Sequence, residues 1–171
     1  SLSLMEGRVT RQLLSSPPSL NVIARPRSFR RPAIPHATSV DLGGKAFLIG
    51  YDLTPTGSLA PGTSLALTLY WRAANNFGVS YKVFTHLVGP DGQIRGQKDS
   101  LPLDGAAPTT SWAPGEFLTD RYEIPIDTDA PAGMYQVIVG MYDGNTGARL
   151  PISGGKADQI VVTKVEVGAG Q

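Results

Sequence analysis

The sequence has no cysteine and only two histidines, His36 and His86. A chain without thiols forms no disulfide, iron–sulfur cluster or cysteine-ligated zinc site, and two histidines are too few for a three-histidine zinc site. The longest apolar runs are only a few residues, far short of the roughly 20 that a membrane-spanning helix requires. We therefore expect a chain of 171 residues that folds on its hydrophobic core alone, and we predict no metal and no cofactor.

The N-terminus lacks the composition of a complete signal peptide. Its apolar residues Leu2, Leu4 and Met5 are interrupted by serines and followed by Glu6, so there is no apolar stretch of the required length. The chain also begins with serine, and its first methionine is Met5. These features predict that the sequence is a piece of a longer protein.

No segment has a sustained helical period, and glycine and proline together make up about a fifth of the residues. From residue 45 onward, short runs of alternating apolar and polar residues are separated by Gly, Pro and Asp turns. This pattern is typical of antiparallel strands. We predict an all-β fold in which eight or nine strands form a two-sheet β-sandwich, with an immunoglobulin-like and a jelly-roll arrangement both open.

The strands are expected where the alternation is clearest, and residues 64–73 give the best example because Leu65, Leu67, Leu69 and Trp71 share one face. Residues 101–116 contain three prolines and are expected to form a long loop. The predicted strands cover residues 45–53, 64–73, 81–88, 93–100, 117–126, 134–143, 148–152 and 159–167, with 19–24 as an open candidate for a first strand.

Charge divides the chain into two parts. Residues 1–40 carry six arginines and one glutamate, a net charge of +5, whereas residues 41–171 carry nine basic and thirteen acidic residues, a net charge of −4. We predict a basic, proline-containing arm over 1–40, with the first strand possible within it, and a sandwich domain over 41–171. The arm's arginines either meet anionic lipid headgroups or pair with the acidic body. With a total of +1, we predict no nucleic-acid partner.

Aromatic side chains are the candidate ligand-binding residues, because their faces can stack on the apolar face of a sugar ring. The alternation places Trp71, Tyr122 and Tyr135 on apolar faces, and hence in the core. Tyr70 and Tyr142 fall on the other faces of their strands, opposite to the apolar residues. Trp112 lies in the long loop, where it forms either an exposed platform or a lid over one end of the core. The predicted ligand-binding residues are therefore Tyr70, Trp112 and Tyr142.

His86 is the one candidate for acid–base chemistry, with Asp99 or Asp120 as the carboxylate that orients it. No Gly-x-Ser-x-Gly motif accompanies it, so a hydrogen-bonded structural histidine is the simpler interpretation. Carboxylates in turns suit a structural calcium ion, but the nearest fragment, Asp127-Thr128-Asp129, lacks the spacing of a calcium loop. We predict no catalytic residue and no metal ligand.

Residues 45–152 contain a series of short motifs, and their order identifies a protein family more specifically than any single motif does. The motifs are Leu48-Ile49-Gly50-Tyr51-Asp52-Leu53, Leu69-Tyr70-Trp71-Arg72-Ala73, Tyr81-Lys82-Val83-Phe84-Thr85-His86-Leu87, Ser111-Trp112-Ala113-Pro114-Gly115-Glu116 and Val139-Gly140-Met141-Tyr142-Asp143. This series resembles the β-sandwich domain appended C-terminally to bacterial membrane glycosyltransferases of the dolichyl-phosphate-mannose mannosyltransferase type. It is also similar, more loosely, to carbohydrate-recognising sandwich modules.

The resemblance implies a non-catalytic accessory domain outside the cytoplasm, next to the membrane portion of its parent protein. The catalytic acids of such enzymes lie in that membrane portion, so no catalytic residue is carried over to this chain. The expected partners are a glycan or glycolipid and the membrane-embedded portion of the parent. The alternatives are a structural protein-interaction domain and, third, a small hydrolase that uses His86.

Overall fold

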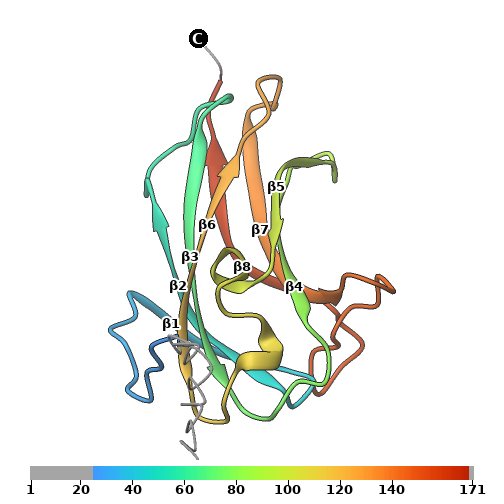
Figure 1. Cartoon of the computed structure of the whole chain (residues 1–171). Helices are drawn as coiled ribbons and strands as arrows, with labels where there is room; N and C mark the ends of the chain where they lie inside the picture. The colour runs from blue at the N-terminus through green and yellow to red at the C-terminus, as the bar shows by residue number, and fades with distance from the viewer. Residues whose placement is uncertain (1–24, 170–171) are drawn as a thin grey trace, which may run out of the picture.

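The computed structural model describes residues 25–169, which form two antiparallel four-stranded sheets packed face to face (Figure 1). One sheet has the order β1-β2-β3-β6 and the other β5-β4-β7-β8. The strands are β1 (His36–Leu42), β2 (Ala46–Thr54), β3 (Ser64–Ala73), β4 (Tyr81–Val88), β5 (Ile94–Ser100), β6 (Phe117–Pro125), β7 (Gly133–Asp143) and β8 (Ile160–Val167). The eight strands confirm the predicted β-sandwich. Because β3 pairs with β6 and β4 with β7, the order matches the immunoglobulin-like alternative.

Two details of the predicted strands differ. Residues 148–152 form no strand and make only isolated bridges, from Arg149 to Tyr142 and from Ile152 to Leu42. Strand β1 was not predicted, because it follows closely spaced prolines and its alternation is weak; it begins at His36, inside the range assigned to the arm. The candidate strand over 19–24 lies outside the described residues. The loop over 101–116 contains two short 3-10 turns, Pro102–Gly105 and Thr109–Ser111.

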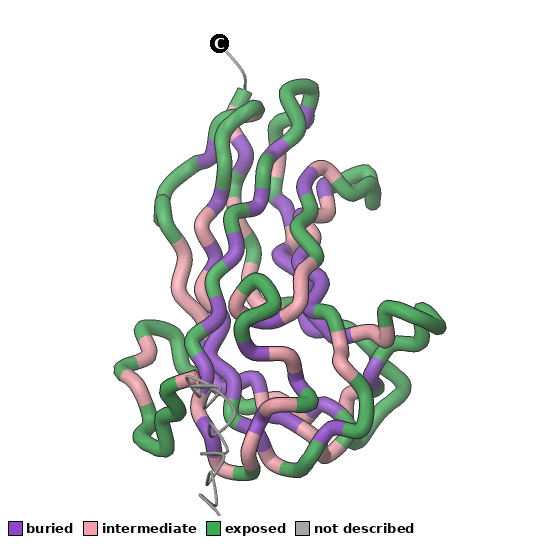
Figure 2. Tube along the Cα trace, viewed as in Figure 1, coloured by how far each residue is buried: buried purple, intermediate pink, exposed green. Residues whose placement is uncertain are grey.

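The core lies between the sheets and consists of the residues that alternate inward, as Figure 2 shows along the central strands. Four inward residues of β3, Leu65, Leu67, Leu69 and Trp71, are fully buried, and Tyr122 and Tyr135 are also buried in this core. The predicted core positions of Trp71, Tyr122 and Tyr135 are therefore confirmed. Within residues 25–169, no helix has the length and apolar character needed to cross a membrane.

Residues 25–35, which we call the strap, connect to the sandwich before β1 begins. Arg25 and Arg27 each form an ion pair with Glu116, at 2.6 and 2.7 Å, and the Glu116 side chain is 0% exposed. Phe117 donates its amide to the carbonyl of Ser28, so the strap adds one bridge to the free edge of β6. A buried carboxylate that holds two guanidinium groups fixes this end of the strap to the loop that precedes β6.

The other end of the strap lies on the outer face of the first sheet. Gly50 in β2 has no Cβ, and a Cβ there would collide with the γ2 methyl group of Ile34 and the carbonyl of His36. Glycine at position 50 therefore lets the strap approach the sheet closely. Residues 29–33, between the two attachments, project from the sandwich as the blue loop in Figure 1.

We expect the substitution Glu116→Ala to lower the free energy of unfolding by about 2–3 kcal/mol, because it removes a buried carboxylate while both arginines regain water. Burial opposes ionisation, but Arg25, the Ala113 amide and Arg27 outweigh it and hold the pKa of Glu116 below its usual value. The stabilisation is thus present at neutral pH and is lost as the pH falls through that lowered pKa. Urea unfolding at several pH values measures it.

Tryptic cleavage of the strap provides the matching readout. We expect cleavage after Arg30 to be faster in the Glu116→Ala variant, because the strap has lost its first attachment. The control is Glu123→Ala, which removes an exposed glutamate from the neighbouring strand β6. Equal cleavage rates in the wild type and both variants would contradict the role assigned to Glu116.

Candidate functional site

The three predicted ligand-binding residues do not lie together. Trp112 is 2% exposed, and its indole Nε1 donates to the carbonyl of Ala107 at 2.9 Å. Its ring packs near Trp71 and Phe77, with centroids 6.4 and 5.4 Å away. Of the two interpretations of Trp112, the structure therefore shows the lid over one end of the core, because little of its ring is open to a ligand.

The two tyrosines lie on opposite faces of the sandwich. Tyr70 is on the outer face of the first sheet, next to Gly50 in the strand register, and is only 9% exposed. Tyr142, near the end of β7, is half-buried on the outer face of the second sheet. Tyr142 lines a cavity together with other polar and aromatic groups, so we build the site around it.

The cavity beside Tyr142 has a volume of about 250 Å³. We call it the Tyr142 pocket, and it is lined by Phe84, His86, Asp99, Tyr142, Gly147 and Arg149. These residues come from β4, β5, β7 and the turn that follows β7. Pairing in the second sheet brings them together, because Phe84 on the central strand β4 lies opposite Asp99 on β5 and Gly140 on β7.

Phe84 forms the floor of the pocket and is almost fully buried, although it alternates outward. Gly140 makes this possible, since a Cβ at position 140 would collide with the Phe84 ring. The Arg149 guanidinium lies over the Phe84 ring, with its Cζ 4.4 Å from the ring centroid. Such a cation–π contact, together with bonds from Arg149 to Asp158 (3.4 Å) and Gln159 (3.1 Å), fixes the guanidinium in place.

Asp99 organises the polar side of the pocket. The Tyr142 hydroxyl donates to Asp99 Oδ2 at 3.0 Å, and His86 Nε2 lies 3.6 Å from Asp99 Oδ1. Burial lowers the pKa of His86, Asp99 opposes the shift, and Arg149 reinforces it, so the imidazole is neutral at pH 7. Burial and the hydrogen bond to Asp99 raise the pKa of Tyr142, so its hydroxyl keeps its proton. The pocket thus presents one carboxylate, one guanidinium and two neutral rings with polar edges.

The geometry also separates the two carboxylates considered for His86. Asp99 faces it, whereas Asp120 is buried in the core and accepts hydrogen bonds from Trp71, Tyr122 and the amide of Leu103. Among residues 25–169, those that line the Tyr142 pocket include no serine, threonine or cysteine, so this described lining offers His86 no aliphatic hydroxyl or thiol nucleophile. In residues 25–169, no group of three or more His, Asp or Glu residues is placed to hold a metal ion.

Sequence reasoning missed Phe84 and Arg149 as parts of the site. The alternation does put Phe84 and His86 together on the outward face of β4. The signal for Phe84 was an outward-facing aromatic residue paired with a glycine, Gly140, on the neighbouring strand. No local pattern marks Arg149, because its position over the ring depends on the turn after β7 and on the bridge to Tyr142.

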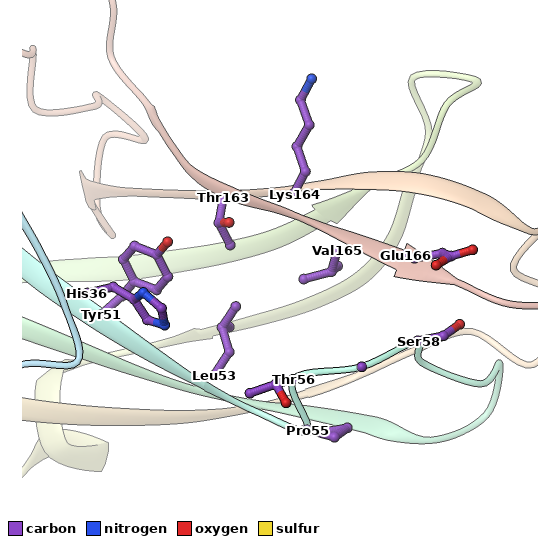
Figure 3. Close-up of a pocket in the computed structure, with 11 residues that line it drawn as sticks. His36, Tyr51, Leu53, Pro55, Thr56, Ser58, Thr163, Lys164, Val165 and Glu166 are labelled. Carbon is purple, nitrogen blue, oxygen red and sulfur yellow. The ribbon is translucent and has the colours of Figure 1, made fainter.

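A second cavity, of about 350 Å³, lies at the open edge between β2 and β8 (Figure 3). His36 and Tyr51 stack there with ring centroids 4.8 Å apart. In Figure 3 the side chain of Lys164 points away from the cavity. The Tyr142 pocket is smaller, but the Tyr142–Asp99 hydrogen bond and the contact of Arg149 with Phe84 hold its polar side chains in place. We therefore regard it as the better candidate site.

No protein-family model matches the chain, and no curated protein matches its sequence. Among solved structures, the chain is similar to the C-terminal domain of wzt, with a TM-score of 0.56 and 17% sequence identity. The similarity covers 82% of this chain and 84% of that chain. At this identity the likeness shows the fold alone. The chain therefore shares its β-sandwich fold with a domain found at the C-terminus of another protein.

Proposed function

We propose that the chain is a non-catalytic accessory domain that binds glycan in the Tyr142 pocket. A sugar ring has an apolar C–H face and a rim of hydroxyl groups. The Tyr142 ring offers a surface for the C–H face, while Asp99 accepts from hydroxyl groups and Arg149 donates to them. A volume of about 250 Å³ suits one sugar unit with its neighbours in solvent.

The observation that carries this proposal is that the polar groups are held in place by the protein itself. Tyr142 is fixed by Asp99, and Arg149 is fixed by Phe84, Asp158 and Gln159. Side chains already held in one conformation lose little entropy when a ligand binds, so more of the interaction energy contributes to affinity. A fixed carboxylate beside an aromatic ring is an arrangement suited to binding.

The parent protein and the location belong to the same proposal. The sequence resemblance supports an appended domain of a membrane glycosyltransferase-like protein, outside the cytoplasm, with a glycan or glycolipid as ligand and the membrane portion as neighbour. The similarity to a C-terminal domain of another protein supports the appended position.

A second candidate function is protein interaction, and exposed apolar side chains on the second sheet favour it. Ile94, Met134 and Val161 are all about half exposed. If a protein partner bound to these side chains, its affinity would depend more on the three apolar residues than on Tyr142 and Arg149. Substitutions in each group therefore separate the two functions.

We expect Tyr142→Ala to weaken glycan binding at least tenfold, because it removes the ring surface and the donor to Asp99. The measurement is a glycan-array screen of the purified chain, followed by titration of any glycan that binds. Arg149→Ala should weaken binding similarly. The control is Tyr51→Ala in the second cavity, which should leave the affinity unchanged within about twofold.

The outcomes discriminate clearly. Loss of binding in Tyr51→Ala but not in Tyr142→Ala would move the site to the second cavity. A folded wild-type chain that binds no glycan on the array would reject glycan binding. Association with a protein partner that Met134→Ala or Val161→Ala abolishes would then support the protein-interaction function.

A further inference from the structure

The strap contains four arginines of two kinds: two attach it to the sandwich, and two are exposed to solvent. Arg25 and Arg27 are paired with Glu116. Arg30 and Arg31, three and four residues further on, are exposed and form no ion pair with any residue in 25–169. From the sequence, the arm's arginines could either pair with the body or face anionic lipid. Of these four arginines, the structure of residues 25–169 shows ion pairs for Arg25 and Arg27 only.

An aromatic ring is displayed beside the two unpaired arginines. Phe29 is 60% exposed, one of the most exposed large apolar side chains in the described structure. It lies at the start of the projecting loop, which Figure 2 colours mostly green. Exposing a phenylalanine to water is unfavourable, so its display next to two cations needs an explanation beyond packing.

The loop that carries these side chains is fixed at both ends. Ser28 is bonded to Phe117 in β6, and Ile34 lies against Gly50 in β2. The five residues between them are therefore presented in a limited set of conformations, which reduces the entropy lost on binding. A further arginine, Arg72, is exposed on β3 beside Phe117 in the strand register, so it extends the positive charge along the same end of the first sheet.

We infer that Phe29, Arg30 and Arg31 bind the surface of an anionic lipid bilayer. Each arginine near such a surface multiplies the binding constant about fivefold, through attraction to the lipid charge. The phenylalanine ring enters the interfacial region beside the headgroups. The contact is distinct from the glycan pocket, because the strap is attached to the first sheet and the Tyr142 pocket lies on the outer face of the second.

Charge distribution favours a bilayer over a nucleic acid. The body of the chain has a net charge of −4, so it repels a polyanion that would have to follow an extended surface. Nucleic-acid binding usually employs several phosphate contacts along a stripe or groove. A bilayer, by contrast, is touched by one projecting loop, and an apolar ring beside two cations fits its interface.

The test is co-sedimentation of the full chain with vesicles at low salt. One set contains phosphatidylcholine alone, and the other includes about a third of anionic phosphatidylglycerol. We expect binding to the anionic vesicles only, and its loss at about 1 M salt, where the Debye length falls to roughly 3 Å. The double variant Arg30→Gln/Arg31→Gln should reduce binding about 25-fold, and Phe29→Ala severalfold.

The control is Lys82→Gln/Lys156→Gln, which changes the net charge equally at exposed residues elsewhere. It should bind within about twofold of the wild type. An equal loss in this control, equal binding to uncharged vesicles, or full retention in the Arg30/Arg31 double variant would overturn the assignment. So would complete displacement by a short oligonucleotide that binds the chain more tightly than the vesicles do.

Discussion

Trp112→Ala is expected to lower the free energy of unfolding by about 3–5 kcal/mol, the largest effect that we predict for a single residue. The indole is almost fully buried against Trp71 and Phe77, so its removal leaves a large cavity at one end of the core. It also leaves the Ala107 carbonyl without the indole N–H. In a chain of this size the loss corresponds to a decrease in melting temperature of about 6–20 °C, measured by thermal unfolding.

Trp112→Phe is the control for this prediction. It keeps an aromatic ring in the core and loses the hydrogen bond to Ala107 together with part of the buried surface, so its cost should be about 1–2 kcal/mol. Glycan binding by the folded Trp112→Phe variant should equal that of the wild type. A Trp112→Ala variant with normal melting temperature and no glycan binding would instead make Trp112 a ligand platform.

Asp120→Asn should change how stability depends on pH, because Asp120 is ionisable and buried. Its carboxylate accepts hydrogen bonds from Tyr122 (2.6 Å), Trp71 (3.3 Å) and the amide of Leu103 (2.9 Å). Leu103 has a left-handed backbone conformation, with φ of 54°, so this bond also holds a turn that leucine disfavours. Three neutral donors without a cation only partly offset the burial of the charge.

Burial raises the pKa of Asp120 from 3.8 to about 6, against the opposing effect of its three hydrogen bonds. A carboxyl group with a raised pKa favours the folded state when it is protonated. Its contribution to stability is thus fully present below the unfolded pKa of 3.8 and is lost as the pH rises through about 6. The difference across this window is on the order of 3 kcal/mol.

The prediction is tested by urea unfolding of the wild type and Asp120→Asn from pH 7 to pH 4. The wild type should gain about 2.5 kcal/mol relative to the variant over this range, because asparagine does not titrate. Glu116 acts in the opposite direction in both proteins, so the comparison cancels its effect. Parallel stability curves would show that Asp120 has an ordinary pKa. Asp120→Ala, which leaves all three donors unpaired, should be less stable than Asp120→Asn at every pH.

The strands with strong alternation were predictable because their inward residues face a single core. The pattern of Leu65, Leu67, Leu69 and Trp71 places β3 to the residue, and the apolar run of β4 identifies a central strand. The alternation is a weaker guide where a strand forms only because a neighbouring strand pairs with it. Strand β1 owes its existence to hydrogen bonds with β2, whereas residues 148–152 have a strand-like sequence but make only two isolated bridges.

The candidate site was only partly predictable. Alternation put Tyr142 on the outward face of its strand, where it lines the pocket, and its role in ligand binding stays a prediction. It also put Tyr70 outward, but glycine at position 50 allows the strap to come close to that face, and Tyr70 is buried. A periodic pattern gives the face of a strand; it does not say which segment covers that face.

The sequence by itself determined the all-β class, the central strands and the apolar core, because these follow from local periodicity and from residues that must avoid water. Only the tertiary structure decided that Asp99 and Arg149 meet at Tyr142, that Trp112 closes the core, and that Arg25 and Arg27 pair with Glu116 while Arg30 and Arg31 stay exposed. The physical reason is distance along the chain. Most of these contacts join segments far apart in the sequence, and their geometry depends on strand register and on which loop lies over which sheet.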